Sequence, residues 1–378
     1  MTHRLLGTDR PLAEVYDVAL LDLDGVVHVG DRPVPGAPAD LAEVRALGMR
    51  LAFVTNNASR TPDAVAARLS GMGVPAQAAE VTTSAQAAAH HLADVLPGGA
   101  AVLVVGGEGL HQAVAERGLR PTTTATDAEG VPVAAVVQGF APEVGWTLLS
   151  EAAVAVRSGA RWVATNLDRT IPSERGALPG NGSLVNVLQF AFGFEPESTG
   201  KPDPTMHRES VERSGAQRPV VVGDRLDTDI EGAVRASAPS LLVLSGVTDA
   251  AAALTAGPGS RPDHLARDVS GLLHAHPEVD WSSHPERSRT LGRWSAVIAG
   301  GVVRVGTVGD GGTGDGVTGP ATDDGGEADD ELDLLRLVAP AVWRLLDEAP
   351  ADGSGAVPLV ATDEAAAEVV RRWRVTGR

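Results

Sequence analysis

The chain has 378 residues, too many for one ordinary domain, and an apolar share of 43% that can supply a sizeable core, so two or three domains are expected. It has no cysteine, which excludes disulfides, thiolate metal ligands and a cysteine nucleophile. The formal net charge of −18 argues against nucleic acid or an anionic membrane as a partner, because phosphate contacts need clustered lysines and arginines.

Neither a membrane span nor export is expected. No uncharged apolar run reaches the roughly 18 residues that a spanning helix needs. The first residues do not resemble a secretory signal, which favours the cytoplasm. A small metabolite remains as the class of partner, and it can be anionic if a metal ion and a few cations reverse the local field.

The predicted elements begin with a strand–helix–strand unit. The run VALLDLD at 18–24 indicates a buried strand, and RLAFVTNN at 50–57 indicates a second strand that ends in polar residues. Apolar residues at helical spacing lie between them over 37–47, and TPDAVAARLSGMG at 61–73 predicts a helix capped by Thr61. This order favours a parallel sheet with right-handed crossovers.

Strand–helix units continue to about residue 270, which predicts an α/β fold. We expect residues 1–82 and 183–270 to form a Rossmann-like core with a doubly wound parallel sheet. The intervening residues 83–182 are expected to form an inserted α/β cap domain. Further predicted strands lie at 100–107, 134–140, 161–166, 219–224 and 240–248.

The last hundred residues have a different character. Residues 271–284 are irregular and are expected to be a linker. Residues 285–378 predict a small α+β extension, with a strand-like run at 293–306 and two helical segments near the end. The Gly/Asp-rich stretch 306–330 between them is expected to be a flexible loop.

Reactive side chains follow several of the predicted strands. In an open parallel sheet, ligands collect beyond the carboxyl ends of the strands. Carboxylates that converge there repel one another unless a cation lies among them, and Mg²⁺ with oxygen ligands suits such a site. A lysine and hydroxyl or amide donors beside it suit a phosphoryl group, and a carboxylate can attack its phosphorus to form an aspartyl-phosphate. The candidate residues are Asp22, Asp24, Thr55, Asn56, Asn57, Lys201, Asp224 and Asp229.

Four stretches, DLDGVV, FVTNNASR, GKPDP and GDRLDTDI, resemble in order and context the motifs of haloacid dehalogenase superfamily phosphatases. The similarity is to the NagD-like, nitrophenylphosphatase-like branch, and it covers roughly residues 15–250. That branch carries its cap between the second and third motifs. The stretch ATNLDRTIPSERGALPGNGSLV at 164–185 resembles the substrate loop of that cap.

The resemblance implies roles for the reacting side chains. Asp22 would be the nucleophile and a metal ligand. Asp24 would be the general acid and base, and would also bind the metal through its backbone carbonyl. Lys201 would neutralise charge shared between Asp22 and the phosphoryl group, and Gly25 would allow the backbone to approach closely after the nucleophile.

The resemblance also implies binding roles. Thr55 and the amides near Asn56 and Asn57 would hold the phosphoryl oxygens. Asp224 would bind Mg²⁺ directly. Asp229 would support the metal indirectly, through the residues that bind it or through a water molecule. His28 follows the nucleophile loop by a few residues and is a candidate to line the mouth of the site.

The extended layout resembles actinobacterial glycerol 3-phosphate phosphatases, whose C-terminal region is similar to a truncated acetyltransferase fold. This implies Mg²⁺-dependent hydrolysis of glycerol 3-phosphate to glycerol and phosphate. Leu167 stands where the branch usually has proline, and Ala141 stands where an acid often follows the strand. Both departures lie in the cap, which selects the leaving group.

Several alternatives stay open. The same chemistry could act on phosphoglycolate, pyridoxal 5′-phosphate or a nucleotide monophosphate, and phosphomutase action is a further variant. In a different class, the chain would be a scaffold or binding protein that uses its extension. The extension has no Gly-rich pyrophosphate turn, so an architectural role or a homodimer is expected of it rather than acetyl transfer.

Three other features receive structural interpretations. The run VLVVGGEGL at 102–110 imitates a dinucleotide fingerprint but lacks its last glycine, so ordinary strand–turn–helix packing is expected. His90 and His91 are adjacent and are expected to be solvated or half-buried. Asp227 is expected to cap the following helix.

Overall fold

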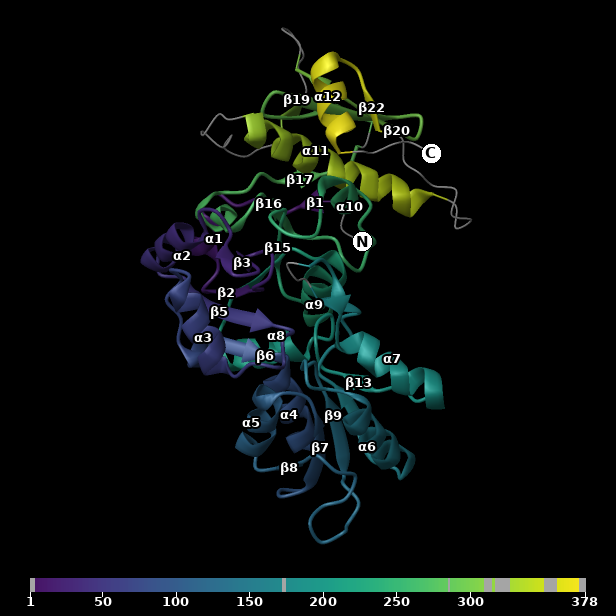
Figure 1. Cartoon of the computed structure of the whole chain (residues 1–378). Coiled ribbons are helices and arrows are strands. Elements are labelled where there is room, and N and C mark those ends of the chain that lie inside the picture. Colours follow the sequence, from purple (N-terminus) through teal and green to yellow (C-terminus); the bar gives the residue numbers. More distant parts are fainter. Residues whose placement is uncertain are drawn as a thin grey trace.

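The computed structural model describes residues 4–171, 175–284, 286–308, 315–316, 327–349 and 359–373. Three parts are stacked along the long axis of the molecule, with the cap at the bottom of Figure 1, the core in the middle and the C-terminal region at the top. The predicted flexible loop at 306–330 lies mostly outside the described residues. Among the helices described, none is both long and apolar enough to cross a membrane.

The middle part is built around a six-stranded sheet with strand order β16-β15-β14-β2-β5-β6, in which every neighbouring pair is parallel. The central strand β2 is buried along its whole length, as expected of a parallel strand with helices on both faces. The strands are β2 (Val18–Leu21), β5 (Arg50–Thr55), β6 (Val81–Thr83), β14 (Pro219–Gly223), β15 (Ser240–Val243) and β16 (His264–Ala266).

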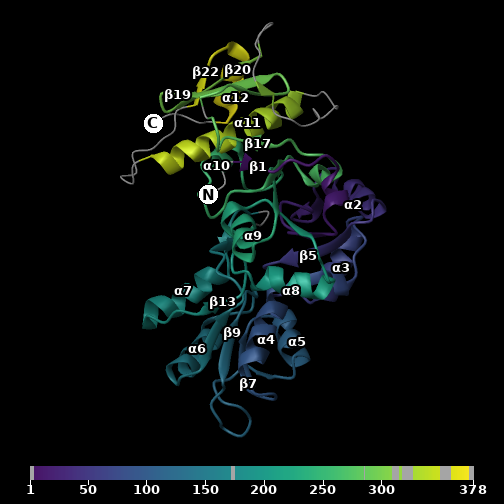
Figure 2. The same ribbon diagram turned by 180° about the vertical axis from the view of Figure 1, so that it is seen from behind.

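Alternate residues of β2 point into two separate apolar clusters. Ala19 and Leu21 pack with α2 and α3, whereas Val18 and Leu20 pack with α8 and α9. Figure 1 shows α2 and α3 beside β5, and the view from behind in Figure 2 shows α8 on the opposite side. The predicted doubly wound parallel sheet is therefore confirmed. These helices are α2 (Ala37–Ala46), α3 (Pro62–Gly71), α8 (Thr205–Ser214) and α9 (Glu231–Ala236).

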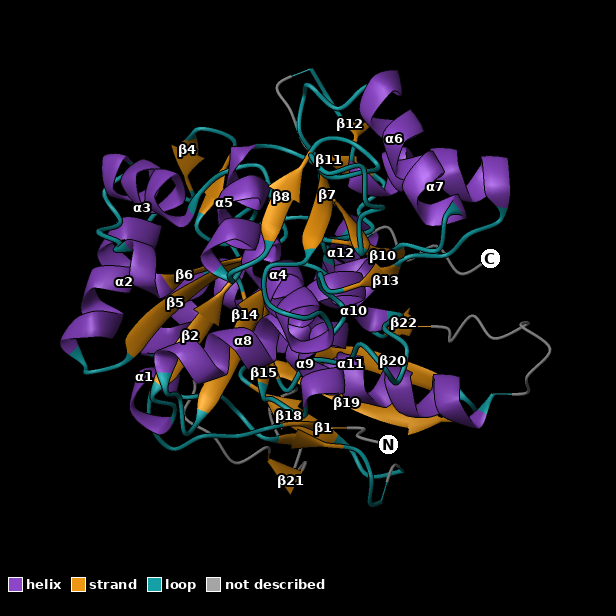
Figure 3. Cartoon of the chain, turned by 90° about the horizontal axis from the view of Figure 1, so that it is seen from below, coloured by secondary structure: helices purple, strands orange, loops and turns teal. Residues whose placement is uncertain are grey.

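The predicted inserted domain is built on a second parallel sheet, with strand order β13-β10-β9-β7-β8. Helices α4 and α5 share an apolar cluster on one face, and α6 and α7 share one on the other. Figure 3 shows α5 and α6 on the two sides of β7 and β8. The elements are α4 (Ser84–Val95), β7 (Ala101–Val105), α5 (Glu108–Glu116), β8 (Arg120–Thr122), β9 (Ala135–Gln138), α6 (Trp146–Arg157), β10 (Arg161–Ala164), α7 (Asn181–Phe192) and β13 (Glu197–Ser198).

The return from this domain to the core differs from the predicted boundary at residue 182. Strand β13 pairs with β10 in the cap sheet, with Val163 opposite Glu197. Val185 and Leu188 of α7 are buried in the cap cluster. We therefore propose that the cap runs from about residue 84 to residue 198, because the sheet partner of β13 decides the domain to which this segment belongs.

The C-terminal part is the expected α+β extension. Its mixed sheet has the order β21-β18-β19-β20-β22, and helix α11 packs against β18, β19 and β20. The elements are β18 (Arg289–Leu291), β19 (Trp294–Ala299), β20 (Val302–Thr307), β21 (Asp315–Gly316), α11 (Glu327–Glu348), β22 (Leu359–Ala361) and α12 (Glu364–Arg372).

One apolar cluster joins the extension to the core. It contains Leu242 and Leu265 from the core sheet together with Trp294 and Trp343 from the extension. The segment 271–284, expected to be a linker, belongs to the same packed region. Its Trp281 is fully buried, and the indole nitrogen donates a hydrogen bond to the backbone oxygen of Leu337 at 2.9 Å.

The two ends of the described chain meet at this junction. Strand β1 (Arg4–Leu5) pairs antiparallel with β17 (Val279–Asp280). The extension is therefore packed onto the core over a continuous interior. The remaining short elements are α1 (Leu12–Val15), β3 (His28–Val29), β4 (Arg32–Pro33), η1 (Ala78–Glu80), β11 (Thr170–Ile171), β12 (Leu178–Pro179), η2 (Leu226–Ile230), α10 (Ala250–Leu254) and η3 (Val269–Leu273).

Candidate active site

Three neighbouring strands of the core sheet end at one rim and deliver polar side chains there. Asp22 follows β2, Thr55 ends β5, and Asp224 follows β14. The backbone nitrogen of Asp22 continues the ladder by donating to Val222 at 2.9 Å. The structure thus brings together residues that are about 30 and 200 positions apart, because parallel neighbours place their carboxyl ends on the same edge.

Lys201 links two of the carboxylates from below the rim. Its side chain is 3% exposed, and Nζ donates to Asp22 Oδ1 and, at 2.6 Å, to Asp229 Oδ1. The backbone oxygen of Val54 lies 3.4 Å from the same nitrogen. Burial alone would lower the pKa of Lys201, but the two carboxylates raise it above its ordinary value, so the ammonium stays charged.

Asp22, Asp224 and Asp229 form one tight group of carboxylates. Each offers an oxygen, and these oxygens lie within 4.8 Å of one another. Burial raises the pKa of Asp22 well above its ordinary value, with Lys201 working in the opposite direction. Burial and the charge of Asp229 raise the pKa of Asp224 to about 6. Among the described residues, Lys201 is the one cation bonded directly to this group, so a divalent ion would relieve its repulsion.

The hydrogen bonds of these carboxylates show which of their oxygens remain available to bind a metal ion. Both oxygens of Asp229 are used, one by Lys201 and the other by the backbone nitrogen of Arg225 at 3.1 Å. Asp224 Oδ2 accepts from the backbone nitrogen of Val247 at 2.6 Å, whereas its buried Oδ1 has no partner among the described residues. A buried carboxylate oxygen without a partner fits a Mg²⁺ ligand. Asp229 fits the supporting position predicted for it.

Two glycines let the backbone close around Asp224. Gly25 has φ +88°, a conformation that favours glycine, and a Cβ there or at Gly246 would collide with the Asp224 carboxylate. Ser245 Oγ donates to the backbone oxygen of Gly25 at 2.6 Å. The loop after β15 therefore holds both the loop that follows Asp22 and the Asp224 carboxylate, and the backbone approaches closely at Gly25 as predicted.

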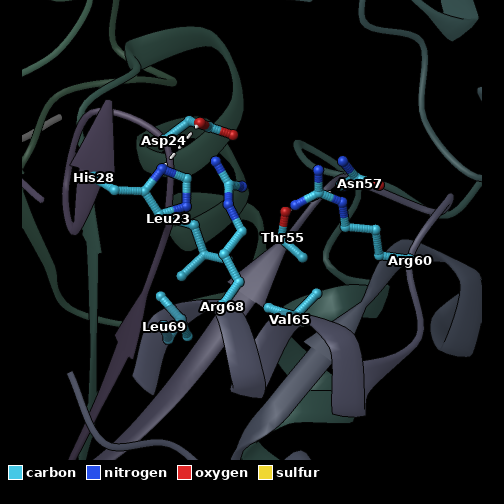
Figure 4. Close-up of a pocket in the computed structure, with 9 residues that line it drawn as sticks. All are labelled: Leu23, Asp24, His28, Thr55, Asn57, Arg60, Val65, Arg68 and Leu69. Carbon is cyan, nitrogen blue, oxygen red and sulfur yellow. Dashed lines mark hydrogen bonds and ion pairs between the residues drawn. The ribbon is translucent and has the colours of Figure 1, made fainter. Parts of the chain in front are cut away.

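Asp24 lies apart from the carboxylate group. Its side chain is 53% exposed and faces a small pocket shared with Thr55, Asn57 and His28 (Figure 4). Asp24 Oδ1 lies 3.4 Å from Nδ1 of His28, whose pKa is lowered by burial while Asp24 opposes that effect. His28 thus lines this pocket together with Asp24, and its predicted place at the mouth of the active site stays a prediction. The metal contact predicted for the backbone carbonyl of Asp24 stays a prediction.

Asn57 and Asn56 play different structural parts. Asn57 Oδ1 accepts from the backbone nitrogen of Ser59 at 2.9 Å, and the Asn57 backbone nitrogen points to Thr55 Oγ1 at 3.2 Å. The Asn56 side chain turns away from the pocket. Its Oδ1 accepts from the backbone nitrogen of Lys201 at 2.9 Å, and its Nδ2 donates to Asp168 at 3.0 Å. The predicted phosphoryl contact can therefore involve the backbone of Asn56 but not its amide side chain.

Sequence reasoning missed two features of this site. It identified the loop 164–185 but not Asp168, which that loop places against Asn56. It also overlooked that Lys201 is the only lysine of the chain, since every other basic side chain except histidine is arginine. A compact ammonium that must reach several acceptors cannot be exchanged for a planar guanidinium. This compositional signal was available from the sequence.

The structural interpretations made for other residues have mixed outcomes. The run 102–110 forms β7 and the start of α5 by ordinary packing, and a Cβ at Gly109 would lie 2.5 Å from the backbone oxygen of Arg60. His90 and His91 are half-buried as predicted. The helix-cap prediction for Asp227 is wrong, because its carboxylate pairs with Arg225 at 2.8 Å and no side chain caps that turn.

Two family models match the chain. One, described as haloacid dehalogenase-like hydrolase, matches residues 19–120. The second, described as HAD-hydrolase-like, matches residues 198–272. The stretch between the two matches lies in the cap.

Individual proteins extend this similarity. The chain is 43% identical over 366 residues to the D-glycerol 3-phosphate phosphatase of Mycobacterium tuberculosis, which covers 96% of both chains. It is 36% identical over 264 residues to the 5′-nucleotidase YutF of Bacillus subtilis, which covers 69% of this chain and 95% of that one. The crystal structure of glycerol phosphate phosphatase from M. tuberculosis in complex with magnesium matches with a TM-score of 0.80 at 41% identity, over 98% of this chain and 100% of that chain. The corresponding complex with calcium gives a TM-score of 0.82.

These similarities agree with the geometry of the rim. They confirm the predicted superfamily, its fold class, its hydrolytic phosphatase chemistry and the predicted magnesium cofactor. The match to the glycerol 3-phosphate phosphatase covers 96% of this chain and so includes most of the C-terminal extension, whereas the match to the 5′-nucleotidase covers 69%. The chain belongs to the haloacid dehalogenase-like hydrolases.

Proposed function

We propose that this chain hydrolyses glycerol 3-phosphate to glycerol and phosphate with Mg²⁺, through an aspartyl-phosphate on Asp22. One observation carries the chemistry: Lys201 lies between Asp22 and Asp229, beside the unpaired Oδ1 of Asp224. A fixed cation and a metal-ready carboxylate thus flank one nucleophilic carboxylate. This arrangement suits a phosphoryl group, whose transition state spreads charge over three oxygens.

The chain's own residues divide the reaction between them. Lys201 holds Oδ1 of Asp22, which leaves the other oxygen to attack phosphorus. Asp24 gives a proton to the departing alkoxide of glycerol. In the second half of the reaction, Asp24 takes a proton from the water that attacks the aspartyl-phosphate and releases Asp22. The exposed position of Asp24 at the pocket mouth suits contact with both the leaving group and water.

The phosphoryl oxygens would be held by the Thr55 hydroxyl and the backbone amides of the following turn. Asp22 and Asp224 would hold the metal, with Asp229 keeping Lys201 in place. A bound Mg²⁺ supplies neutralisation of the charge on the phosphoryl oxygens.

The choice of glycerol 3-phosphate is supported by identity to a glycerol 3-phosphate phosphatase over 96% of this chain. Phosphoglycolate, pyridoxal 5′-phosphate and nucleotide monophosphates use the same chemistry and belong in the comparison. A scaffold role is less well supported, because the carboxylates and the lysine are assembled as a complete set.

Phosphate release from these four substrates, ranked by kcat/KM with Mg²⁺, tests the proposal. Glycerol 3-phosphate is expected to rank first, and Asp22→Asn is expected to abolish turnover. Asp9→Asn, at a side chain 94% exposed, is the matched control and should retain full activity. Release of no phosphate from any of the esters would contradict the proposal, and so would an isomer formed without free phosphate.

We also propose that the substrate is a small phosphorylated metabolite of the cytoplasm and that the chain forms a homodimer. Light scattering during gel filtration should give about twice the chain mass of 38.7 kDa. A mass equal to one chain would contradict the dimer and leave the chemistry unaffected.

A further inference from the structure

A carboxylate of the cap, that of Asp168, contacts the catalytic rim. This residue follows β10, at the carboxyl end of the cap sheet. Its Oδ2 accepts a hydrogen bond from Nδ2 of Asn56 at 3.0 Å. Asn56 lies in the turn after β5, in the core. The contact therefore joins the two domains beside the reacting groups.

The backbone around Asp168 is tightly held. Its nitrogen donates to Asn166 Oδ1 at 3.1 Å, and its oxygen accepts from the nitrogen of Gly182 at 2.9 Å. A Cβ at Gly180 would collide with the backbone oxygen of Asp168, and one at Gly182 would collide with that of Leu167. The cap thus presents this carboxylate at a fixed position.

Asn56 connects that carboxylate to Lys201. Its Oδ1 accepts from the backbone nitrogen of Lys201 at 2.9 Å, and its Nδ2 also reaches the backbone oxygen of Lys201 at 3.3 Å. The backbone oxygen of Asn56 is held in turn by Asn166 Nδ2 at 2.7 Å and Ser84 Oγ at 2.6 Å. Asn56 is therefore fixed through its backbone oxygen and bonds the Lys201 backbone through its side chain.

A carboxylate can only accept hydrogen bonds, so Asp168 can hold only the Nδ2 end of the Asn56 amide. The Oδ1 end is thereby kept against the Lys201 nitrogen. If the amide turned over, its oxygen would face both the Asp168 carboxylate and the Lys201 backbone oxygen, and its NH₂ would face the Lys201 N–H. Both arrangements are repulsive. Asp168 thus adds to the preference that the Lys201 backbone itself gives for this amide orientation.

We propose that Asp168 is a positioning residue: through Asn56 it sets the backbone of Lys201, and so aligns the ammonium with Asp22. The expected effect of Asp168 on kcat rests on the proposed phosphatase activity, whereas its effect on the Lys201 backbone does not. The alignment depends on a docked cap, so cap closure and the placement of Lys201 are one event. A displacement of about 1 Å at such a group can cost on the order of 100-fold in rate.

Kinetics test the first consequence. Asp168→Ala is expected to lower kcat by about 10- to 100-fold with KM changed less than about 2-fold. Asp168→Asn keeps an oxygen that can accept from Asn56 and should restore most of kcat. In an Asn56→Ala background, Asp168→Ala should have little further effect, since the connection is already broken. A direct contact between Asp168 and substrate would instead raise KM and keep its full effect in that background, which would overturn the proposal.

A spectroscopic test needs neither metal nor substrate. Because Lys201 is the only lysine, protein labelled with ¹⁵N-lysine gives one backbone amide signal, which reports its hydrogen bond to Asn56. This signal should shift in Asp168→Ala and stay near its place in Asp168→Asn. Glu129→Ala, at a cap carboxylate 67% exposed, is the control and should leave the signal unchanged. An unmoved signal in a folded Asp168→Ala protein would refute the positioning role whether or not the substrate is correct.

Discussion

Arg261 and Asp347 form a bidentate ion pair across the junction between core and extension. Both guanidinium–carboxylate distances are 2.7 Å, and the side chains are 2% and 11% exposed. The guanidinium also lies over the ring of Trp343 at 5.6 Å. This pair is buried in the region where the core and the extension share their apolar interior. Removal of one partner would therefore leave the other charge buried without compensation.

Asp347→Ala is expected to lower the free energy of unfolding by about 3–5 kcal/mol, because Arg261 stays buried without its partner. Urea denaturation followed by tryptophan fluorescence measures the change. Glu348→Ala on the same helix is the matched control. Its carboxylate is 54% exposed, and its contact with Arg344 at 2.9 Å should be worth less than about 1 kcal/mol. Equal effects from the two variants would show that burial of the pair is unimportant.

Removal of residues 285–378 is expected to unfold the rest of the chain or to make it aggregate. The cut would expose Leu242, Leu265 and Trp281, which now lie in the apolar cluster shared with α11. Circular dichroism and light scattering of the shortened chain test this. A monodisperse, folded product with unchanged turnover would show that the core is independent of the extension.

Lys201→Arg is expected to lower kcat by about 100- to 1,000-fold although it keeps the positive charge. The ammonium reaches Asp22, Asp229 and the Val54 oxygen from one atom, which a planar guanidinium cannot do in a filled space. Steady-state kinetics with thermal unfolding as a check on folding measure the loss. Arg50→Lys, at an exposed side chain, should leave kcat unchanged. Near-normal kcat in Lys201→Arg would mean that charge alone suffices.

Magnesium is expected to raise the melting temperature of the wild-type protein and to have no such effect on Asp224→Asn. Ligands that bind the folded state stabilise it. The variant exchanges a charged oxygen donor for an amide at the position where Oδ1 has no other partner. A thermal scan with and without Mg²⁺ provides the measurement, with Asp227→Asn as the nearby control because that carboxylate is 68% exposed and pairs with Arg225. A full metal response in Asp224→Asn would remove it from the ligand set.

Acid is expected to destabilise the fold through His264. This ring is buried, hydrogen-bonded to Tyr16 at 3.1 Å and edge-on to His276, and burial lowers the pKa of His264 from 6.5 to about 4. Between those two values the unfolded chain binds a proton that the folded chain does not. Stability is therefore fully present above pH 6.5 and falls as the pH drops towards 4, by an amount on the order of 3 kcal/mol.

The matched measurement is urea denaturation of wild type and His264→Gln at several pH values from 7 to 4. The raised pKa values of Asp22 and Asp224 act in the opposite direction, since protonation of these groups favours the folded state. These two groups are common to both proteins. The difference between the slopes of unfolding free energy against pH in wild type and His264→Gln therefore isolates His264. Parallel slopes would show that the histidine does not contribute.

The core of the site was predictable from the sequence because strand ends and motif order are local properties. The buried run before Asp22 and the one before Asp224 identify two strands, and parallel pairing then places both carboxylates on one rim. The doubly wound core follows from the alternation of strands and helices. The requirement for a cation follows from like charge at short range, with no need for coordinates.

Other features depend on contacts that no local pattern encodes. The orientation of the Asn56 amide is decided by Lys201 and Asp168, which are 145 and 112 positions away. The later cap boundary that we propose could not be read from the sequence, because β13 is only two residues long and is defined by its partner β10. The segment 271–284 resembles a linker in composition, yet Trp281 is buried there because the extension covers it.

The scarcity of lysine has a practical consequence for anyone who handles this protein. The sole lysine is 3% exposed and lies inside the reaction centre, so reagents that acylate lysine side chains find none on the folded surface. A lysine introduced at an exposed position would thus be the one exposed lysine side chain to which a fluorophore or a sensor chip could be attached. In the unaltered protein, the rate at which Lys201 is acylated would report how often the structure around Asp22 opens to solvent.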